Sequence, residues 1–218
     1  MLRPIELYIG LRYTRAKRRN HFISFISGIS MVGIALGVMA LIVVLSVMNG
    51  FERELRERIL GMASHATVAG HQQPLTDWPE VRETALASGL GVVGAAPYIE
   101  GEGMLRRGAQ LSGTLLRGVL PKYEDEVSDV GAHMVEGALA DLTPGTFNIV
   151  IGKELAAVLG VTRGDKVDLM IPQTTVTPAG VLPRFRRFTV AGIFQVGMFE
   201  YDRSLVLLHI DDAAALYR

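Results

Sequence analysis

Cysteine is absent from the 218 residues of this chain. The absence excludes disulfides, thiolate metal ligands and thiol catalysis, so an exported domain would be stabilised by its core alone. The phosphate loop G-x-x-x-x-G-K-[ST] and the G-x-S-x-G turn of serine hydrolases are also missing. The five histidines lack H-E-x-x-H spacing, and no calcium-loop pattern occurs. We therefore expect no catalytic residues, no metal and no cofactor, which argues against a membrane-anchored enzyme.

Charge is absent from one long segment near the start of the chain. The 27 residues from Phe22 to Met48 carry no charged side chain. About 20 apolar residues suffice to span a bilayer as a helix. A buried helix of a soluble protein and a cleaved signal peptide are the alternatives, but the apolar region of a signal peptide is only about 7–15 residues long. The length therefore favours an uncleaved transmembrane helix over 22–48.

Net charge is zero, with 22 basic and 22 acidic residues, but the charges are unevenly placed. Residues 1–21 carry six basic side chains against Glu6, a net charge of 6 − 1 = +5. Basic residues before a span keep that end in the cytoplasm, which places the remainder outside it. This positive charge could also indicate nucleic-acid binding, but its position beside the span favours contact with anionic lipid headgroups. Segment 1–21 is expected to be a cytoplasmic amphipathic segment, because Ile5, Tyr8, Ile9 and Tyr13 recur at helical spacing.

An apolar stripe continues past the end of the uncharged segment. Its members recur at steps of three or four residues, the spacing of one helix face, and they are Val44, Met48, Phe51, Leu55, Ile59 and Met62. Three i,i+4 pairs of opposite charge lie on the other faces: Glu52–Arg56, Arg53–Glu57 and Glu54–Arg58. The pattern predicts that the helix continues outward as a stalk over 49–63. Its stripe then needs cover from a partner helix or a lipid-like ligand.

From residue 64 the pattern becomes that of an α+β domain with mixed strands, expected over 64–218. Strands are predicted at His65–Ala69, Gly91–Tyr98, Gly103–Arg107, Leu111–Val119, Asn148–Ile151, Lys166–Ile171, Arg186–Phe194 and Arg203–His209. Helices are predicted from Trp78 to about Ser88, with Asp77 as the N-cap, from Gly152 to Leu159, and after Asp211.

The segment PQTTVTPAGVLPRFRR, residues 172–187, is the most unusual part of this domain. The predicted strands around it are separated by 14 residues, whereas hairpin loops usually have about 2–5. Prolines stiffen the segment, and Arg184, Arg186 and Arg187 lie at its distal end. Stiffness lowers the ordering cost of binding. We interpret the segment as a projection that enters a groove of a partner, with a loop folded back on the core as the alternative.

Two stretches carry a resemblance to a known family. IGLRYTRAKRRNHFISFISGISMVGIALGVMALIVVLSVMNGFERELRERILG resembles the start of LolC/LolE-type permeases, the membrane subunits of the lipoprotein-releasing ABC transporter. NIVIGKELAAVLGVTRGDKVDLMIP resembles the periplasmic domain that this family shares with MacB-type transporters. The resemblance implies a membrane protein of the bacterial inner membrane: one N-terminal transmembrane helix, extended into a periplasmic stalk, followed by an α+β MacB-like periplasmic domain.

The resemblance also implies partners. In this family a LolC-like and a LolE-like permease pair with LolD-like ATPase subunits, which hydrolyse the ATP. The complex extracts triacylated lipoproteins from the membrane lipids and passes them to a LolA-like periplasmic carrier. Nucleic acid is not among the expected partners. Family members continue into three further transmembrane helices, so we expect this chain to be part of a longer protein whose periplasmic domain is incomplete here.

Site residues follow from the resemblance by position. The carrier-binding hook is Pro172 to Pro183, with Val176, Thr177, Pro178, Ala179, Gly180, Val181 and Leu182 within it. The carrier-binding pad is Arg163, Phe185 and Arg186. The acyl chains are expected to contact Val44, Val47, Met48, Phe51 and Leu55, although packing against sister helices alone is the alternative. Ala179 and Phe185 depart from the methionine and the polar residue that the LolC-like pattern has there.

Three assignments remain open within the family. The hook, with its Thr-Pro-x-Gly core, favours a LolC-like subunit over a LolE-like one or a single merged permease. A related MacB-like or FtsX-like permease that transmits ATPase motion without sorting lipoproteins is the alternative function. Such relatives are expected to lack the hook.

Overall fold

The computed structural model describes residues 4–14, 21–62, 64–70, 74–177 and 180–217. The chain divides into two compact units, residues 1–55 and 56–218. In the first unit, α1 spans Pro4–Thr14 and most of α2 follows, a single helix of His21–Met62. Within Phe22–Arg56, the most apolar 18-residue window has a mean hydropathy of 2.7 and none of it is buried, so α2 is long and apolar enough to cross a membrane. The continuous helix confirms the prediction that no break occurs at the start of the charged segment.

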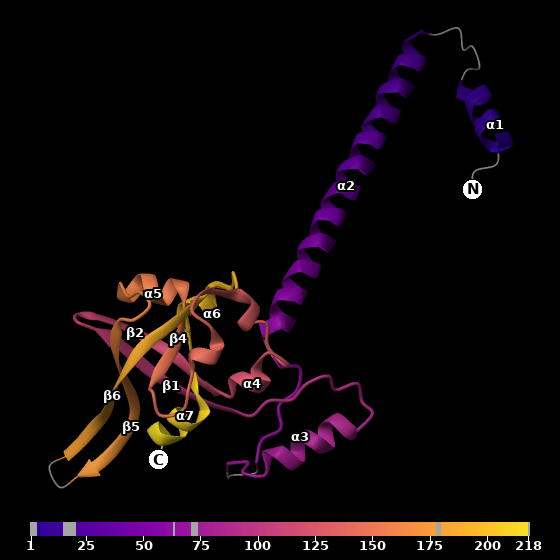
Figure 1. Ribbon diagram of the computed structural model, residues 1–218. Helices are drawn as coiled ribbons and strands as arrows, with labels where there is room; N and C mark the ends of the chain where they lie inside the picture. Colours follow the sequence, from indigo (N-terminus) through magenta and orange to yellow (C-terminus); the bar gives the residue numbers. More distant parts are fainter. Residues whose placement is uncertain (1–3, 15–20, 63, 71–73, 178–179, 218) are drawn as a thin grey trace. The chain divides into compact units, whose positions relative to one another are not determined.

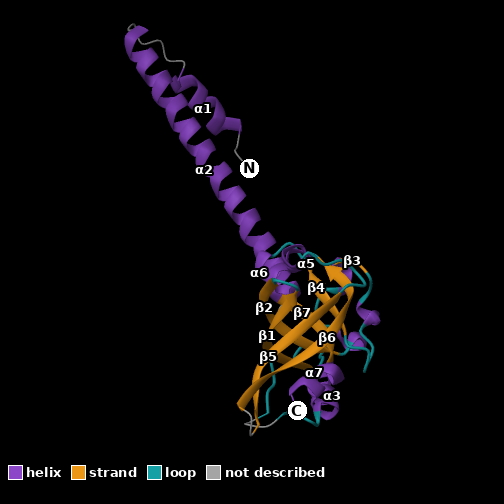
Figure 2. Ribbon diagram, turned by 90° about the vertical axis from the view of Figure 1, so that its left-hand side faces the viewer, coloured by secondary structure: helices purple, strands orange, loops and turns teal. Residues whose placement is uncertain are grey.

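The second unit is built on seven strands, each drawn in Figures 1 and 2. They are β1 (Tyr98–Arg107), β2 (Gln110–Val119), β3 (Met134–Glu136), β4 (Asn148–Gly152), β5 (Lys166–Thr177), β6 (Gly180–Phe194) and β7 (Leu205–His209). The order is β3-β6-β4-β7-β2-β1-β5, and β5 also pairs with β6. The six strands other than β3 therefore form a closed circuit of pairings. Two of these pairings, β2–β7 and β4–β6, are parallel, which confirms the predicted α+β class with mixed strands.

The core follows from strand alternation around this circuit. In β4, Ile149 and Ile151 belong to one buried cluster, and Val150 between them belongs to another. The first cluster also takes apolar residues from α5 (Lys153–Leu159) and α7 (Ile210–Tyr217), which lie at opposite ends of the strands (Figure 1). The second is covered by the segment between β2 and β4, through Val130, Leu139 and Leu142.

Shorter helices connect the strands. They are α3 (Trp78–Ala87), α4 (Pro121–Glu124), η1 (Gly131–His133), η2 (Leu139–Asp141) and α6 (Phe199–Ser204). Helix α3 confirms the predicted helix, although the Asp77 side chain makes no capping hydrogen bond. The final helix begins at Ile210, so Asp211 lies in its first turn rather than at its N-cap.

Several predicted strands were wrong. Residues 65–69 and 91–97 form no strand, and 203–204 belong to α6, not to β7. These segments have apolar side chains but find no partner strand, and an unpaired extended segment is not a strand. The structure adds the short strand β3, which pairs with β6 through Met134 and Glu136.

The 14-residue connection predicted after residue 171 was also wrong. β5 continues to Thr177 and β6 starts at Gly180, so only residues 178–179 separate them, and these lie outside the described residues. The pairing has an irregularity between Ile171 and Thr174, next to Pro172. Proline has no N–H to donate and is tolerated at such places in a sheet. The projection is therefore a long β-hairpin rather than an irregular loop.

Candidate functional site

The predicted hook corresponds to the outer part of the β5–β6 hairpin. We call residues Thr174–Thr177 and Gly180–Pro183 the hairpin arm. Its register runs from Thr174 opposite Pro183 to Thr177 opposite Gly180, with Val176 opposite Val181. β1 pairs with β5 only at 168–170, and β4 pairs with β6 only from Thr189 onward. The arm thus extends beyond the rest of the sheet as two strands paired with each other, as Figure 1 shows in orange.

The adjacent residues Phe185 and Arg186 point to opposite faces of β6, because side chains alternate along a strand. The ring of Phe185 lies 5.9 Å from the guanidinium carbon of Arg106, on β1. The Arg186 guanidinium instead lies over the ring of Phe147, 3.7 Å from its centroid. The structure therefore separates these two members of the predicted pad.

The face that carries Phe185 also holds a short row of charges. Asp168 lies between two arginines on neighbouring strands: its Oδ1 is 2.8 Å from Arg187 Nε, and its Oδ2 is 3.5 Å from Arg106 Nη2. The hydrogen bond from Arg187 lowers the pKa of Asp168 below its ordinary value. The carboxylate stays ionised at neutral pH, so the charge of Arg187 is already compensated within the protein.

Arg163, the remaining pad residue, is held at the junction between α5 and β5. Its Nη2 lies 3.0 Å from Asp141 Oδ2, and its Nε donates to the carbonyl oxygen of Ala191 at 2.8 Å. Half of its side chain, 53%, stays exposed. Two fixed hydrogen bonds orient the guanidinium while leaving part of its surface available to a partner.

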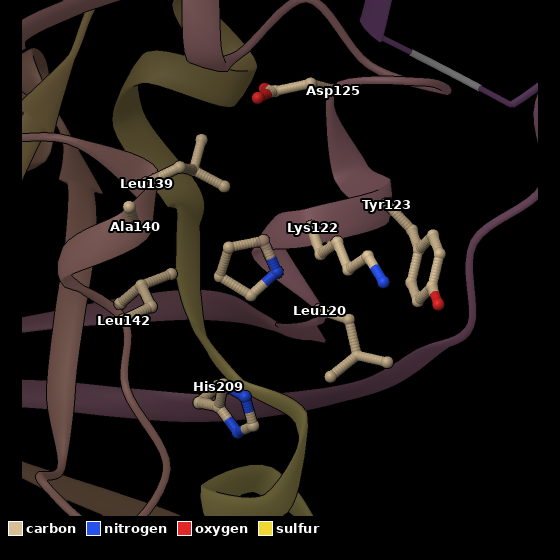
Figure 3. A pocket seen from close by; sticks show the side chains of 9 residues that line it. Leu120, Lys122, Tyr123, Asp125, Leu139, Ala140, Leu142 and His209 are labelled. Atoms are coloured by element: carbon tan, nitrogen blue, oxygen red, sulfur yellow. The ribbon is translucent and has the colours of Figure 1, made fainter.

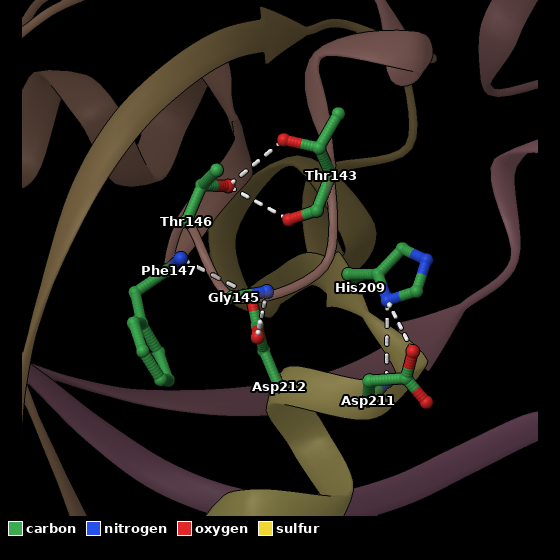
Figure 4. A network of polar contacts seen from close by, with 7 residues as sticks. All are labelled: Thr143, Gly145, Thr146, Phe147, His209, Asp211 and Asp212. Atoms are coloured by element: carbon green, nitrogen blue, oxygen red, sulfur yellow. Dashed lines mark hydrogen bonds and ion pairs between the residues drawn. The ribbon is translucent and has the colours of Figure 1, made fainter.

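One segment contacts both arginines, and we call it loop 141–147. Asp141 at its start pairs with Arg163, and Phe147 at its end lies under Arg186. The loop is fixed from α7 by Asp212, which is only 2% exposed. Asp212 accepts hydrogen bonds from the backbone N–H groups of Gly145 at 2.8 Å and Phe147 at 3.1 Å (Figure 4). No local pattern in the sequence marks Asp212 or Phe147, because 65 residues separate them.

His209 and Asp211 lie beside this network in Figure 4. The backbone N–H of Asp211 donates to His209 Nδ1 at 3.2 Å, so this nitrogen carries no proton in that arrangement. The Asp211 carboxylate also approaches Nδ1, at 3.5 Å. The backbone hydrogen bond is the shorter of these two contacts.

A cavity of about 460 Å³ lies next to His209 and was not anticipated from the sequence. Figure 3 shows most of its lining, which comes from the start of α4, from η2 and from the end of β7. The lining is mainly apolar: Leu120, Pro121, Lys122, Tyr123, Asp125, Leu139, Ala140, Leu142 and His209. No cluster of metal-ligating side chains occurs there or elsewhere in the described part of the chain.

The end of α2 is joined to the domain through the turn after α4. Asp129 N–H donates to the carbonyl oxygen of Gly61 at 2.9 Å. At the end of α4, Glu124 is 1% exposed, and its carboxylate oxygens have no hydrogen-bond partner among the described residues. Arg117 Nη2 is 3.9 Å away. Burial is the main cause that raises the pKa of Glu124, and Arg117 offsets it only in part.

The predicted acyl-chain residues lie on α2. Val44, Val47, Met48, Phe51 and Leu55 are all exposed, at 42–67% of their surface. They belong to the first unit, in which the described apolar side chains of α2 are exposed. Such a surface requires lipid or another protein around it.

Comparison with known proteins identifies the type of domain. Residues 27–217 match the family of MacB-like periplasmic core domains. The chain belongs to this family. It is also 47% identical, over its whole length, to the lipoprotein-releasing system transmembrane protein LolC of Xylella fastidiosa, of which it covers 52%. Identity to the LolE protein of Haemophilus influenzae is 31% over 92% of this chain and 49% of that protein.

These relatives confirm the resemblance to LolC/LolE-type permeases, and the higher identity to LolC agrees with the preference for a LolC-like subunit. They do not favour a permease that sorts no lipoproteins. The chain spans about half the length of the curated relatives it matches. Among solved structures, the extracellular domain of the noncanonic ABC-type transporter YknZ from Gram-positive bacteria superposes with a TM-score of 0.40 at 17% identity. That match covers 62% of this chain and 66% of that domain.

Proposed function

We propose that this MacB-like chain is the N-terminal part of a permease subunit that extracts lipoproteins from the inner membrane and passes them to a periplasmic carrier. The observation that carries the proposal is the hairpin arm, in a chain 47% identical to a LolC protein. A two-stranded arm that extends beyond the rest of the sheet is a shape suited to a groove of another protein. Backbone pairing within the arm fixes its shape before binding, which lowers the ordering cost.

The partners in this proposal are a LolE-like permease, a LolD-like ATPase and a LolA-like carrier. The chain itself hydrolyses no ATP, and its part is to hold the substrate and dock the carrier. Residues 1–21 lie on the cytoplasmic side, 22–48 cross the inner membrane, 49–63 form the stalk and 64–218 lie in the periplasm. The excess of basic residues before the span supports this orientation.

The apolar stripe on α2 has a role in the same proposal. A lipoprotein with three acyl chains cannot leave the bilayer unprotected, since each buried CH₂ is worth about 0.8 kcal/mol. Val44, Val47, Met48, Phe51 and Leu55 continue an apolar face up to the charged part of the helix. They accept the acyl chains during extraction, before the carrier takes them.

Photo-crosslinking in cells tests the docking role. A photoreactive residue is placed at Val176 or Val181 of the full-length gene product, and at Val135 on β3 as an exposed control in the same domain. We expect crosslinks to the periplasmic carrier from the two arm positions and none from Val135. Crosslinks to the carrier from all three positions, or from none, would contradict the proposal. In that case the arm is only a structural feature of the domain.

A further inference from the structure

Among the described residues, Arg186 differs from the other arginines of this region in having no carboxylate partner. Arg106 and Arg187 share Asp168, Arg107 pairs with Asp165, and Arg163 pairs with Asp141. Within the part of the chain that the structure describes, Arg186 has only the ring contact with Phe147, at 3.7 Å. Stacking uses the flat face of a guanidinium and leaves its N–H donors, which lie in the plane, available for hydrogen bonds.

Phe147 is itself held in an unusual position. Its φ of 52° makes it the one non-glycine residue with positive φ among those described. Such a conformation is disfavoured for a bulky side chain and persists only where the surroundings fix it. Here Asp212 accepts from its N–H, its carbonyl oxygen accepts from Thr189 N–H at 3.0 Å, and its ring packs edge-on against Phe188 at 5.6 Å.

We propose that Phe147 is a positioning residue, an aromatic platform that presents the Arg186 guanidinium to a carboxylate of the protein that docks on the hairpin arm. Arg186 lies three residues beyond the end of the arm, so a partner that takes the arm also reaches this guanidinium. Strand alternation places Arg186 and Asp168 on opposite faces of the hairpin, so Asp168 does not compete for this guanidinium. The inference rests on the proposed function, because the docking protein is the periplasmic carrier.

The same loop orients the second arginine. Asp141 holds Arg163 at one end of loop 141–147, and Phe147 holds Arg186 at the other. Asp212, through Gly145 and Phe147, fixes the loop from α7. One buried carboxylate thereby sets the positions of two cationic side chains that come from different elements. The partner surface is expected to carry at least one carboxylate opposite Arg186.

A double-mutant cycle tests whether Phe147 acts through Arg186. The full-length permease complex is purified, and its dissociation constant for a purified LolA-like carrier is measured with Phe147→Leu, Phe147→Tyr, Arg186→Ala and the double variant Phe147→Leu/Arg186→Ala. Phe147→Leu should weaken binding about threefold to tenfold, the range of a cation–π contact. Phe147→Tyr keeps the ring and should stay within about twofold of the original protein. In the Arg186→Ala background, Phe147→Leu should have no further effect.

The outcomes separate this inference from the proposed function. If Phe147→Leu binds like the original protein, or if its loss persists in the Arg186→Ala background, the platform role is wrong. If a Val181→Asp change in the arm abolishes binding while Phe147→Leu does not alter it, the docking function stands and only the platform fails. If the original complex does not bind the carrier, both fail. Thermal unfolding checks each variant, and Phe147→Met replaces Phe147→Leu if the latter does not fold.

Discussion

Replacing Asp212 by alanine is predicted to destabilise the periplasmic domain severely. The carboxylate is 2% exposed and accepts two backbone hydrogen bonds, from Gly145 at 2.8 Å and Phe147 at 3.1 Å. A hydrogen bond to a charged group contributes about 1.5–3 kcal/mol. Water reaches part of the loop after truncation, so the lower end of that range applies to each bond. The expected loss of unfolding free energy is about 3 kcal/mol.

The assay is thermal or urea unfolding of the complete chain in detergent, followed by fluorescence. Trp78 is the only tryptophan, and its ring packs edge-on against Tyr123 in the second unit, so the signal reports that unit alone. For a unit of this size, about 3 kcal/mol corresponds to a fall in Tm of about 6–12 °C. Asp212→Asn keeps one acceptor oxygen and should lose about half as much.

Asp211→Ala is the matched control. It removes a carboxylate one position earlier in the same helix, but the Asp211 side chain is 71% exposed. Surface substitutions of this kind change stability by less than about 0.5 kcal/mol. If Asp212→Ala and Asp211→Ala shift the unfolding midpoint equally, Asp212 does not fix loop 141–147, and the account of how the two arginines are positioned is refuted.

Three further predictions concern other parts of the chain. Glu124→Gln should raise Tm at pH 7.5, and the gain should shrink as the pH falls toward 4.5. The folded-state pKa is raised, so the ionised carboxylate reduces stability as pH rises, and a gain that grows in acid would contradict this. Gly152→Ala should cost about 1–3 kcal/mol in urea unfolding, since its Cβ would overlap the backbone of Asp202, whereas Gly113→Ala in β2, where a Cβ meets nothing within 4 Å, should be tolerated. A photo-crosslinker at Met48 should capture lipoprotein, and one at Ser46, about 200° around the helix, should not; equal capture from both would exclude a specific stripe.

Local patterns predicted the helical part of the protein well. The uncharged run 22–48 and the i,i+4 charge pairs after it predict one continuous helix, and α2 runs from His21 to Met62. Helix α3 and strands β2 and β4 were also predicted nearly to the residue. These signals arise within a few residues, because helix and strand periodicity is set by the backbone itself.

The hairpin arm shows where local patterns mislead. Its strands extend beyond the rest of the sheet and pair only with each other, and their sequence shows no apolar alternation to identify them. Proline and glycine in the segment favoured a loop instead. Conversely, residues 65–69 and 91–97 have apolar side chains typical of strands but pair with nothing.

By itself, the sequence determined the long apolar helix, the α+β class and the resemblance to the lipoprotein-releasing permeases. Only the tertiary structure decided that Phe185 and Arg186 face opposite ways and that Phe147, bonded to Asp212, lies against Arg186. The physical reason is distance along the chain. Helix and strand periodicity depends on neighbouring residues, whereas a side chain from α7 meets loop 141–147 only after the strands between them have paired.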